Sequence, residues 1–170
     1  MTTLTTERLT LRPAEARDYP GYRAYYMSQR SRYTNGPKSE TEAWKAFCVE
    51  LAHWQMRGYG SFAMTLTEGD DRCIGMVGPW YPHGWPEREI GWLLWPEAEG
   101  KGLAYEAAFA SRAYAYETLK WDTAVSYIDE LNDRSKALAT RLGAKYDPGA
   151  ATLSEDTCVY RHPSPEELRP

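Results

Sequence analysis

The chain has 170 residues, of which 42% are hydrophobic and 26% charged, and this length and balance predict one globular domain rather than two. No apolar run approaches the length of a membrane span, and the net charge of -4 disfavours a general affinity for nucleic acid or anionic membranes. Three unevenly spaced cysteines suggest neither a disulfide framework nor a zinc site, and the first residues lack the layout of a secretion signal. We therefore expect a cytoplasmic protein that uses no metal.

The N-terminal third of the chain predicts one strand and two helices, from the periodicity of its apolar residues. In order, these are a strand at 5–12, a helix at 14–28, a mobile polar loop at 29–38 and a helix at 39–58. Pro20 is expected to interrupt the first helix. Ser39 and Glu42 form a capping-box pattern, which favours the start of the second helix.

The remaining chain changes to a strand period and then alternates strands with helices. It predicts three antiparallel strands at 61–67, 73–81 and 88–95, a helix at 105–119, a strand at 123–128, a helix at 134–142 and a strand at 157–161. Residues 68–71 read as a hairpin turn. Residues 162–170 are rich in proline and charge and predict a frayed tail, so we expect the domain to span residues 1–161.

A glycine-rich turn stands between the strand that ends at Trp95 and the helix that follows. Its sequence is Glu99-Gly100-Lys101-Gly102-Leu103-Ala104. Two glycines allow a close backbone approach to an anion, and the helix start presents unpaired N–H groups, so the turn suits a pyrophosphate. A dinucleotide-binding fingerprint is disfavoured by Tyr105 at its third small position, and a P-loop by the lack of Ser or Thr after Lys101. The alternative is a simple structural turn.

Two further segments stand out near this turn. The segment from Asn132 to Ser135 leads through Leu142 to Gly143-Ala144; on its own it needs only a helix cap and a helix terminator. The strand Glu89-Ile90-Gly91-Trp92-Leu93-Leu94 carries a glycine where a chain-like molecule could come close.

These motifs together resemble those of the GNAT superfamily of N-acetyltransferases, and in particular its RimJ/RimL-like branch. The turn is similar to the Gln/Arg-x-x-Gly-x-Gly/Ala signature of that family, with Glu99 as a departure at the first position. The resemblance covers nearly the whole chain. It implies a single α/β domain in which about four helices flank a mixed central sheet of about six to seven strands.

The resemblance also implies a function, which is transfer of an acetyl group from acetyl-CoA to a primary amine by direct attack in a ternary complex. The residues that it assigns to cofactor binding are Leu93, Leu94, Glu99, Gly100, Lys101, Gly102, Leu103, Ala104, Asn132 and Ser135. A backbone N–H near Leu93 or Leu94 could stabilise the oxyanion. We take Glu106, in the first turn of the next helix, as structural.

Glu89 and Ser135 are the expected catalytic residues. Glu89 would accept the proton of the amine, with Glu87 and His83 as second choices and a solvated strand-end carboxylate as the alternative. Ser135 would stabilise the developing thiolate, because Ala139 stands where many family members carry a tyrosine acid. The alternative for Ser135 is a role in the first helical turn.

The acceptor is either a small-molecule amine or a protein N-terminus, and the sequence does not choose between them. We expect it to enter between residues 29–38 and the aromatic residues 80–85, with no nucleic acid or membrane partner and with homodimer formation left open. The rival interpretation is a non-catalytic module that binds or senses coenzyme A, which the absence of a tyrosine at Ala139 favours.

Overall fold

The computed structural model describes residues 2–169 of the chain. The strands are β1 (Leu4–Thr5), β2 (Leu9–Pro13), β3 (Phe62–Leu66), β4 (Gly75–Trp80), β5 (Glu89–Leu94), β6 (Val125–Asp129), β7 (Lys145–Tyr146) and β8 (Thr157–Arg161). The helices are α1 (Tyr19–Tyr26), α2 (Glu40–Arg57), α3 (Leu103–Glu117) and α4 (Asp133–Arg141), with short 3-10 turns η1 (Ala16–Asp18), η2 (Gln29–Tyr33) and η3 (Pro96–Ala98). The predicted single α/β domain with four helices is confirmed.

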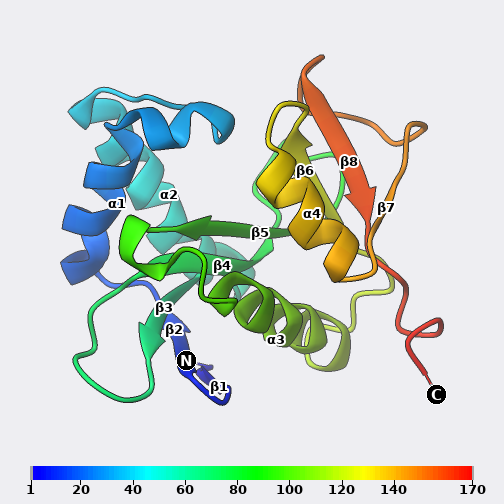
Figure 1. Ribbon diagram of the computed structural model, residues 1–170, viewed down its shortest axis with the longest axis horizontal. Helices are drawn as coiled ribbons and strands as arrows, with labels where there is room; N and C mark the ends of the chain where they lie inside the picture. Colours follow the sequence, from blue (N-terminus) through cyan, green and yellow to red (C-terminus); the bar gives the residue numbers. More distant parts are fainter. Residues whose placement is uncertain (1, 170) are drawn as a thin grey trace.

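The strands form one mixed sheet in the order β1-β2-β3-β4-β5-β6-β8-β7. Every neighbouring pair is antiparallel except β5 and β6, which are parallel and share a single residue pair, Glu89 with Val125. Beyond that pair the two strands diverge, as Figure 1 shows. The C-terminal half of β5 therefore pairs with β4 on one side and has no strand on the other.

Helices cover both faces of the sheet. On one face α3 packs against alternate strand residues such as Met64 and Val77, and on the other α1 and α2 pack against Ala63 and Met76. Neighbouring residues on β3 and β4 thus belong to opposite clusters, as the two-residue period of a strand requires. Because both clusters press on the central strands, β5 is held firmly although one of its edges is open.

The sheet has eight strands within residues 2–169, slightly more than expected. The additions are β1 and β7, which have two residues each and are too short to show an alternating pattern. The predicted strand at 5–12 is wrong as a single element. It is divided into β1 and β2 by a turn in which the Thr6 N–H donates to the Leu9 carbonyl at 2.8 Å.

The region before α2 also differs from the prediction. Pro20 does not interrupt a helix: it lies in the first turn of α1, where its missing N–H has no intrahelical acceptor to lose. The expected mobile loop at 29–38 begins with η2, which is capped by the Ser28 side chain. Residues 29–33 therefore have a defined conformation.

The predicted tail was expected to fray from His162 onward, and for this residue the prediction is wrong. His162 is only 2% exposed, and its N–H donates to the Ala124 carbonyl at 2.9 Å. The Ser126 hydroxyl donates to the Ile90 carbonyl, so the His162 Nε2–H must donate to Ser126 Oγ at 2.9 Å, and Nδ1 faces Arg112. His162 is thus a neutral histidine in the core.

This arrangement predicts a pH-dependent stability. Burial and the nearby Arg112 charge lower the pKa of His162 to about 3, whereas an unfolded histidine titrates near 6.5. Below pH 6.5 His162 therefore binds a proton in the unfolded state but stays neutral in the folded state. Stability is lost as the pH falls toward 3. Between pH 7 and pH 4.5 this one residue should lower the free energy of unfolding by about 2 to 3 kcal/mol.

The measurement is urea unfolding of the wild type and of His162→Gln at several pH values. Glutamine can donate to Ser126 but does not titrate, so the variant should lose less stability on acidification. Parallel losses in the two proteins would show that the protonation of His162 is not linked to unfolding.

Candidate functional site

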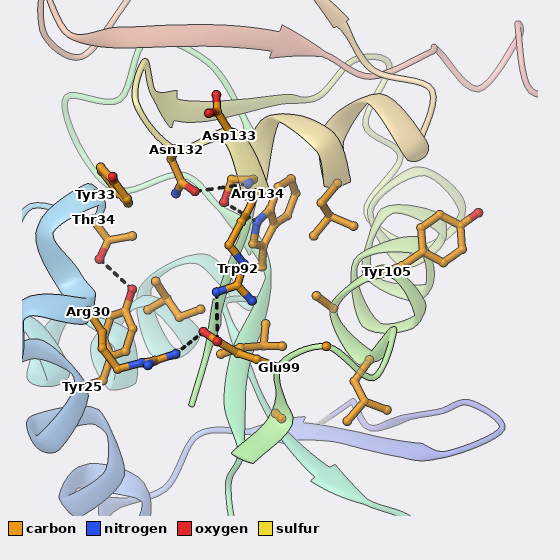
Figure 2. A pocket seen from close by; sticks show the side chains of 18 of the residues that line it. Tyr25, Arg30, Tyr33, Thr34, Trp92, Glu99, Tyr105, Asn132, Asp133 and Arg134 are labelled. Atoms are coloured by element: carbon orange, nitrogen blue, oxygen red, sulfur yellow. Dashed lines mark hydrogen bonds and ion pairs between the residues drawn. The ribbon is translucent and has the colours of Figure 1, made fainter. Parts of the chain in front are cut away.

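A cavity of about 500 Å³ opens where β5 and β6 diverge, between the end of β5 and the start of α4 (Figure 2). Every predicted cofactor-binding residue except Lys101 lines it, namely Leu93, Leu94, Glu99, Gly100, Gly102, Leu103, Ala104, Asn132 and Ser135. Lys101 is exposed, and its carbonyl accepts a hydrogen bond from the Arg8 guanidinium at 2.9 Å. The structure thus brings the end of β5 and the glycine-rich turn together with the start of α4, which is distant in the sequence.

The glycine-rich turn, which we call the cradle (residues 99–104), has an open backbone. Gly100 and Gly102 have φ values of +73° and +76°, which disfavour other residues. A Cβ at Gly100 would meet no atom within 4 Å, and one at Gly102 would meet only Arg8 at 3.6 Å. The glycines are therefore needed for conformation, and the space beside them is free. Gly102 precedes α3 and has no side chain to cap the N–H groups of its first turn, so these are available to an anion.

The cradle is supported by the hairpin of β1 and β2. The Glu106 carboxylate accepts hydrogen bonds from the Thr6 hydroxyl at 2.6 Å, the Arg8 N–H at 2.8 Å and the Arg8 Nε at 2.7 Å. Arg8 also holds the Lys101 carbonyl. Glu106 thus fastens the start of α3 to the N-terminal strands, in the structural role expected of it.

Four arginines around the cavity were missed by the sequence reasoning, because single arginines in a polar segment look like solvated charges. Arg30 and Arg32 come from η2, and Arg134 and Arg141 come from α4. Asp133 and Glu99 are the acids in the same lining, so positive charge predominates. The clustering of basic residues in the segment Gln29-Arg30-Ser31-Arg32 was the available signal.

Glu99 lies between two of these arginines. It forms ion pairs with Arg30 and with Arg134, the latter at 2.9 Å, and Figure 2 shows both guanidinium groups pointing at its carboxylate. Partial burial would raise the pKa of Glu99, but the hydrogen bonds from both arginines outweigh it and the net shift is downward. Glu99 is therefore an anion at neutral pH and cannot itself attract a phosphate.

Ser135 lies at the first turn of α4, with its hydroxyl directed to β5. Its N–H is capped by Asn132 Oδ1 at 3.2 Å, and its Oγ accepts a hydrogen bond from Trp92 Nε1 at 3.2 Å. Because the indole is a donor only, the Ser135 O–H remains free to donate. Ala139, one turn further along α4, is fully buried among apolar residues. Trp92 was not predicted to contact Ser135.

Glu89 lies at the start of β5, where the strands begin to diverge, and does not line the cavity described above. Its Oε2 accepts a hydrogen bond from Trp85 Nε1 at 2.7 Å. Burial raises the pKa of Glu89 to about 7, against the opposing effect of that hydrogen bond. Of the second choices, Glu87 is engaged by Arg161 through two hydrogen bonds of 2.8 Å, and His83 is exposed.

A second acid near Glu89, the buried Glu50 of α2, was also missed. It is 8% exposed, and within the described residues its Oε2 has no hydrogen-bond partner. Burial raises the pKa of Glu50 to about 7, and the charge of Glu89 adds to the shift, so the two acids interact. Glu50 lies on the inward side of α2 with Phe47 and Trp54. Its neighbours at helical spacing are therefore core residues, and the sequence around it indicates a packing helix rather than a functional acid.

Metal-binding clusters and membrane-spanning helices are two other features that bear on the chemistry of the chain. Among residues 2–169, no cluster of three or more His, Cys, Asp or Glu side chains could hold a metal ion. In the same part of the chain no helix is both long enough and apolar enough to cross a membrane.

Comparison with known proteins identifies the family. Residues 8–145 match the family model described as the acetyltransferase (GNAT) domain. The chain belongs to the GNAT acetyltransferase family. It is 42% identical to the acetyltransferase from Agrobacterium tumefaciens str. C58, with a TM-score of 0.91 over 96% of this chain and 95% of that one.

Two more distant proteins are also similar to this chain, the first of them in fold. RimL, a ribosomal L7/L12 alpha-N-protein acetyltransferase in complex with coenzyme A, is 17% identical, with a TM-score of 0.74 over 95% of this chain and 97% of that one. YkkB, an uncharacterized protein of Bacillus subtilis (strain 168), is 24% identical in an alignment of 179 positions that covers 96% of this chain and 96% of YkkB. The glycine-rich cradle of the present GNAT protein thus lies within the residues that the family model matches.

Proposed function

We propose that the protein is an acetyl-CoA-dependent N-acetyltransferase similar to the RimJ/RimL branch, acting on a primary amine by direct attack in a ternary complex. The observation that carries the proposal is the cradle, which opens into the gap between β5 and β6. We further propose that the catalytic domain, expected at residues 1–161, extends to include the buried His162, and that the enzyme works in the cytoplasm.

The residues around the cavity fit coenzyme A, which combines phosphate groups with an extended amide-containing arm. The N–H groups at the start of α3 and the arginines of η2 and α4 would hold the phosphates. The free edge of β5 from Trp92 to Leu94 offers backbone groups to the arm, since no strand pairs with it there. Ser135 and Asn132 lie on the opposite wall.

When bound, acetyl-CoA supplies an acetyl group that is activated as a thioester. Glu89, with a pKa of about 7, would take a proton from the acceptor ammonium near neutral pH, directly or through water. The Ser135 hydroxyl would donate a hydrogen bond to the leaving sulfur, and the Trp92 indole that donates to Ser135 Oγ would strengthen that donation. A backbone N–H of Leu93 or Leu94 would stabilise charge on the acetyl oxygen.

The acceptor would approach between residues 29–38 and residues 80–85. The latter segment is anchored by His53, whose Nε2 accepts a hydrogen bond from the Tyr81 N–H at 3.0 Å and whose ring stacks on Trp80. The interacting acids Glu50, which is buried, and Glu89, which is half-buried, favour a cationic acceptor such as a small amine or a protein N-terminus.

The second candidate function is a non-catalytic coenzyme A sensor, which the buried Ala139 favours because no phenol can act from that position. The deciding experiment measures thiol release from acetyl-CoA with a panel of small amines and N-terminal peptides, alongside calorimetric binding of coenzyme A. Turnover with any amine supports the enzyme, and binding without turnover across the panel supports the sensor. Absence of coenzyme A binding would contradict both candidate functions.

The cradle predicts the effect of Gly102→Asp. The new carboxylate would repel phosphate at the start of α3, and coenzyme A affinity should fall about ten- to a hundredfold, equivalent to about 1.5 to 3 kcal/mol. Gly69→Asp is the matched control, because Gly69 also has a positive φ and open space but lies in the β3–β4 hairpin. Calorimetric titration measures the coenzyme A affinity of both variants. Equal affinities in the two folded variants would refute the proposal that the cradle binds the phosphates of coenzyme A.

Glu89→Gln tests the proposed base. It keeps the size of the side chain but removes the basic site, so the rate at pH 7 should fall about a hundredfold or more. The wild-type rate should rise through an apparent pKa near 7, whereas the variant should recover part of its rate at high pH, where the amine is already neutral. Glu68→Gln, in the exposed hairpin, is the control. An unchanged rate and pH profile would return Glu89 to a structural role.

Ser135→Ala tests the proposed stabilisation of the thiolate. The backbone cap from Asn132 is kept, so the fold should persist, while kcat should fall about ten- to a hundredfold with little change in coenzyme A affinity. Steady-state kinetics and binding are measured for this variant and for Ser154→Ala, which lies before β8. A loss of affinity equal to the loss of kcat would assign Ser135 to cofactor binding alone.

A further inference from the structure

Glu99 joins two elements that approach the cavity from different sides. Arg30 belongs to η2, between α1 and α2, and Arg134 belongs to the first turn of α4. Both guanidinium groups pair with the Glu99 carboxylate at the head of the cradle, so one acid links the η2 segment, the cradle and α4 (Figure 2). All three residues line the cavity.

The other two cavity arginines are placed differently. Arg141 lies over the Tyr105 ring at 4.1 Å and Arg32 lies over the Tyr33 ring at 4.4 Å. Glu99 thus offsets one of the two positive charges of Arg30 and Arg134, whereas the stacked pair has no carboxylate partner of this kind among the ion pairs of residues 2–169.

These ion pairs are suited to exchange. The side chains of Arg30, Arg134 and Glu99 are 39%, 72% and 26% exposed, and ion pairs in such surroundings contribute little to stability. A diphosphate carries more charge than one carboxylate and offers several acceptor oxygens, so it would displace Glu99 as the partner of both arginines.

We infer that Glu99 is an internal competitor: its carboxylate occupies Arg30 and Arg134 in the free protein, and a diphosphate ligand takes both arginines from it on binding. The inference rests on the proposed coenzyme A site. It accounts for the acid at the head of the anion cradle. Glu99 is itself negative, but it holds Arg30 and Arg134 beside the cradle, and these arginines supply the positive charge. It also makes the η2 segment, which borders the expected acceptor entrance, responsive to the donor site.

The experiment is calorimetric titration of coenzyme A and of inorganic pyrophosphate into the wild type, Glu99→Gln and Glu97→Gln. Glu97 is a matched control, because it lies in η3 and pairs with Arg72, and neither residue lines the cavity. Glu99→Gln should bind both ligands about three- to fivefold more tightly at low salt, and the gain should shrink as salt is added. Arg134→Gln should bind both ligands more weakly.

Hydrogen exchange at residues 29–34 provides a readout that does not depend on affinity. Without ligand, Glu99→Gln should exchange faster there than the wild type, and coenzyme A should slow exchange in the variant because the diphosphate then holds Arg30. Equal or weaker binding by Glu99→Gln would overturn the inference and show that Glu99 preorganises the arginines instead. Failure of the proposed function looks different, since wild type and both glutamate variants would then all fail to bind coenzyme A.

Discussion

The single residue pair between β5 and β6 is the constraint on which the site depends. β4 pairs with β5 along six residues, while β6 pairs with it only at Glu89 and Val125. Longer pairing would fill the gap with backbone hydrogen bonds and remove the cavity. The divergence leaves backbone N–H and C=O groups of β5 in need of partners, which an extended ligand or water must supply. Packing on both faces, with Ile90 fully buried on one, keeps β5 in place despite its open edge.

Charge is separated along β5. At its C-terminal end, arginines from η2 and α4 gather around the cradle although the chain as a whole carries a net charge of -4. At its N-terminal end lie the buried Glu50 and the half-buried Glu89, whose pKa values are raised to about 7, above all by loss of solvent. An anionic group is thus favoured at one end of the strand and a cationic group at the other. Perturbed acids of this kind are typical of functional sites, because burying them costs stability.

Support for the cradle comes from the N-terminus of the chain, far from it in sequence. Arg8 and Thr6 bind Glu106, and Arg8 also binds the Lys101 carbonyl, so the first hairpin fixes the turn before α3. Rigidity matters here because ordering the N–H groups of α3 on binding would cost free energy and lower the affinity. Groups that already point into the cavity avoid this loss. The exposed ion pairs of Glu99, in contrast, are weak enough to change partners.

The sequence by itself determined the family, the single α/β domain with four helices, and the position of the cradle between β5 and α3. These features depend on local signals: periodicity, a capping box, and glycines whose φ values are positive. It did not determine which charged side chains meet. Arg30, Arg134 and Glu50 look like solvated or core residues within their own elements, and Glu99 acquires its partners only when η2 and α4 meet at the cradle. His162 reads as part of a polar tail, and only its register beside β6 buries it. Contacts between segments distant in the chain are set by packing, which no local pattern encodes.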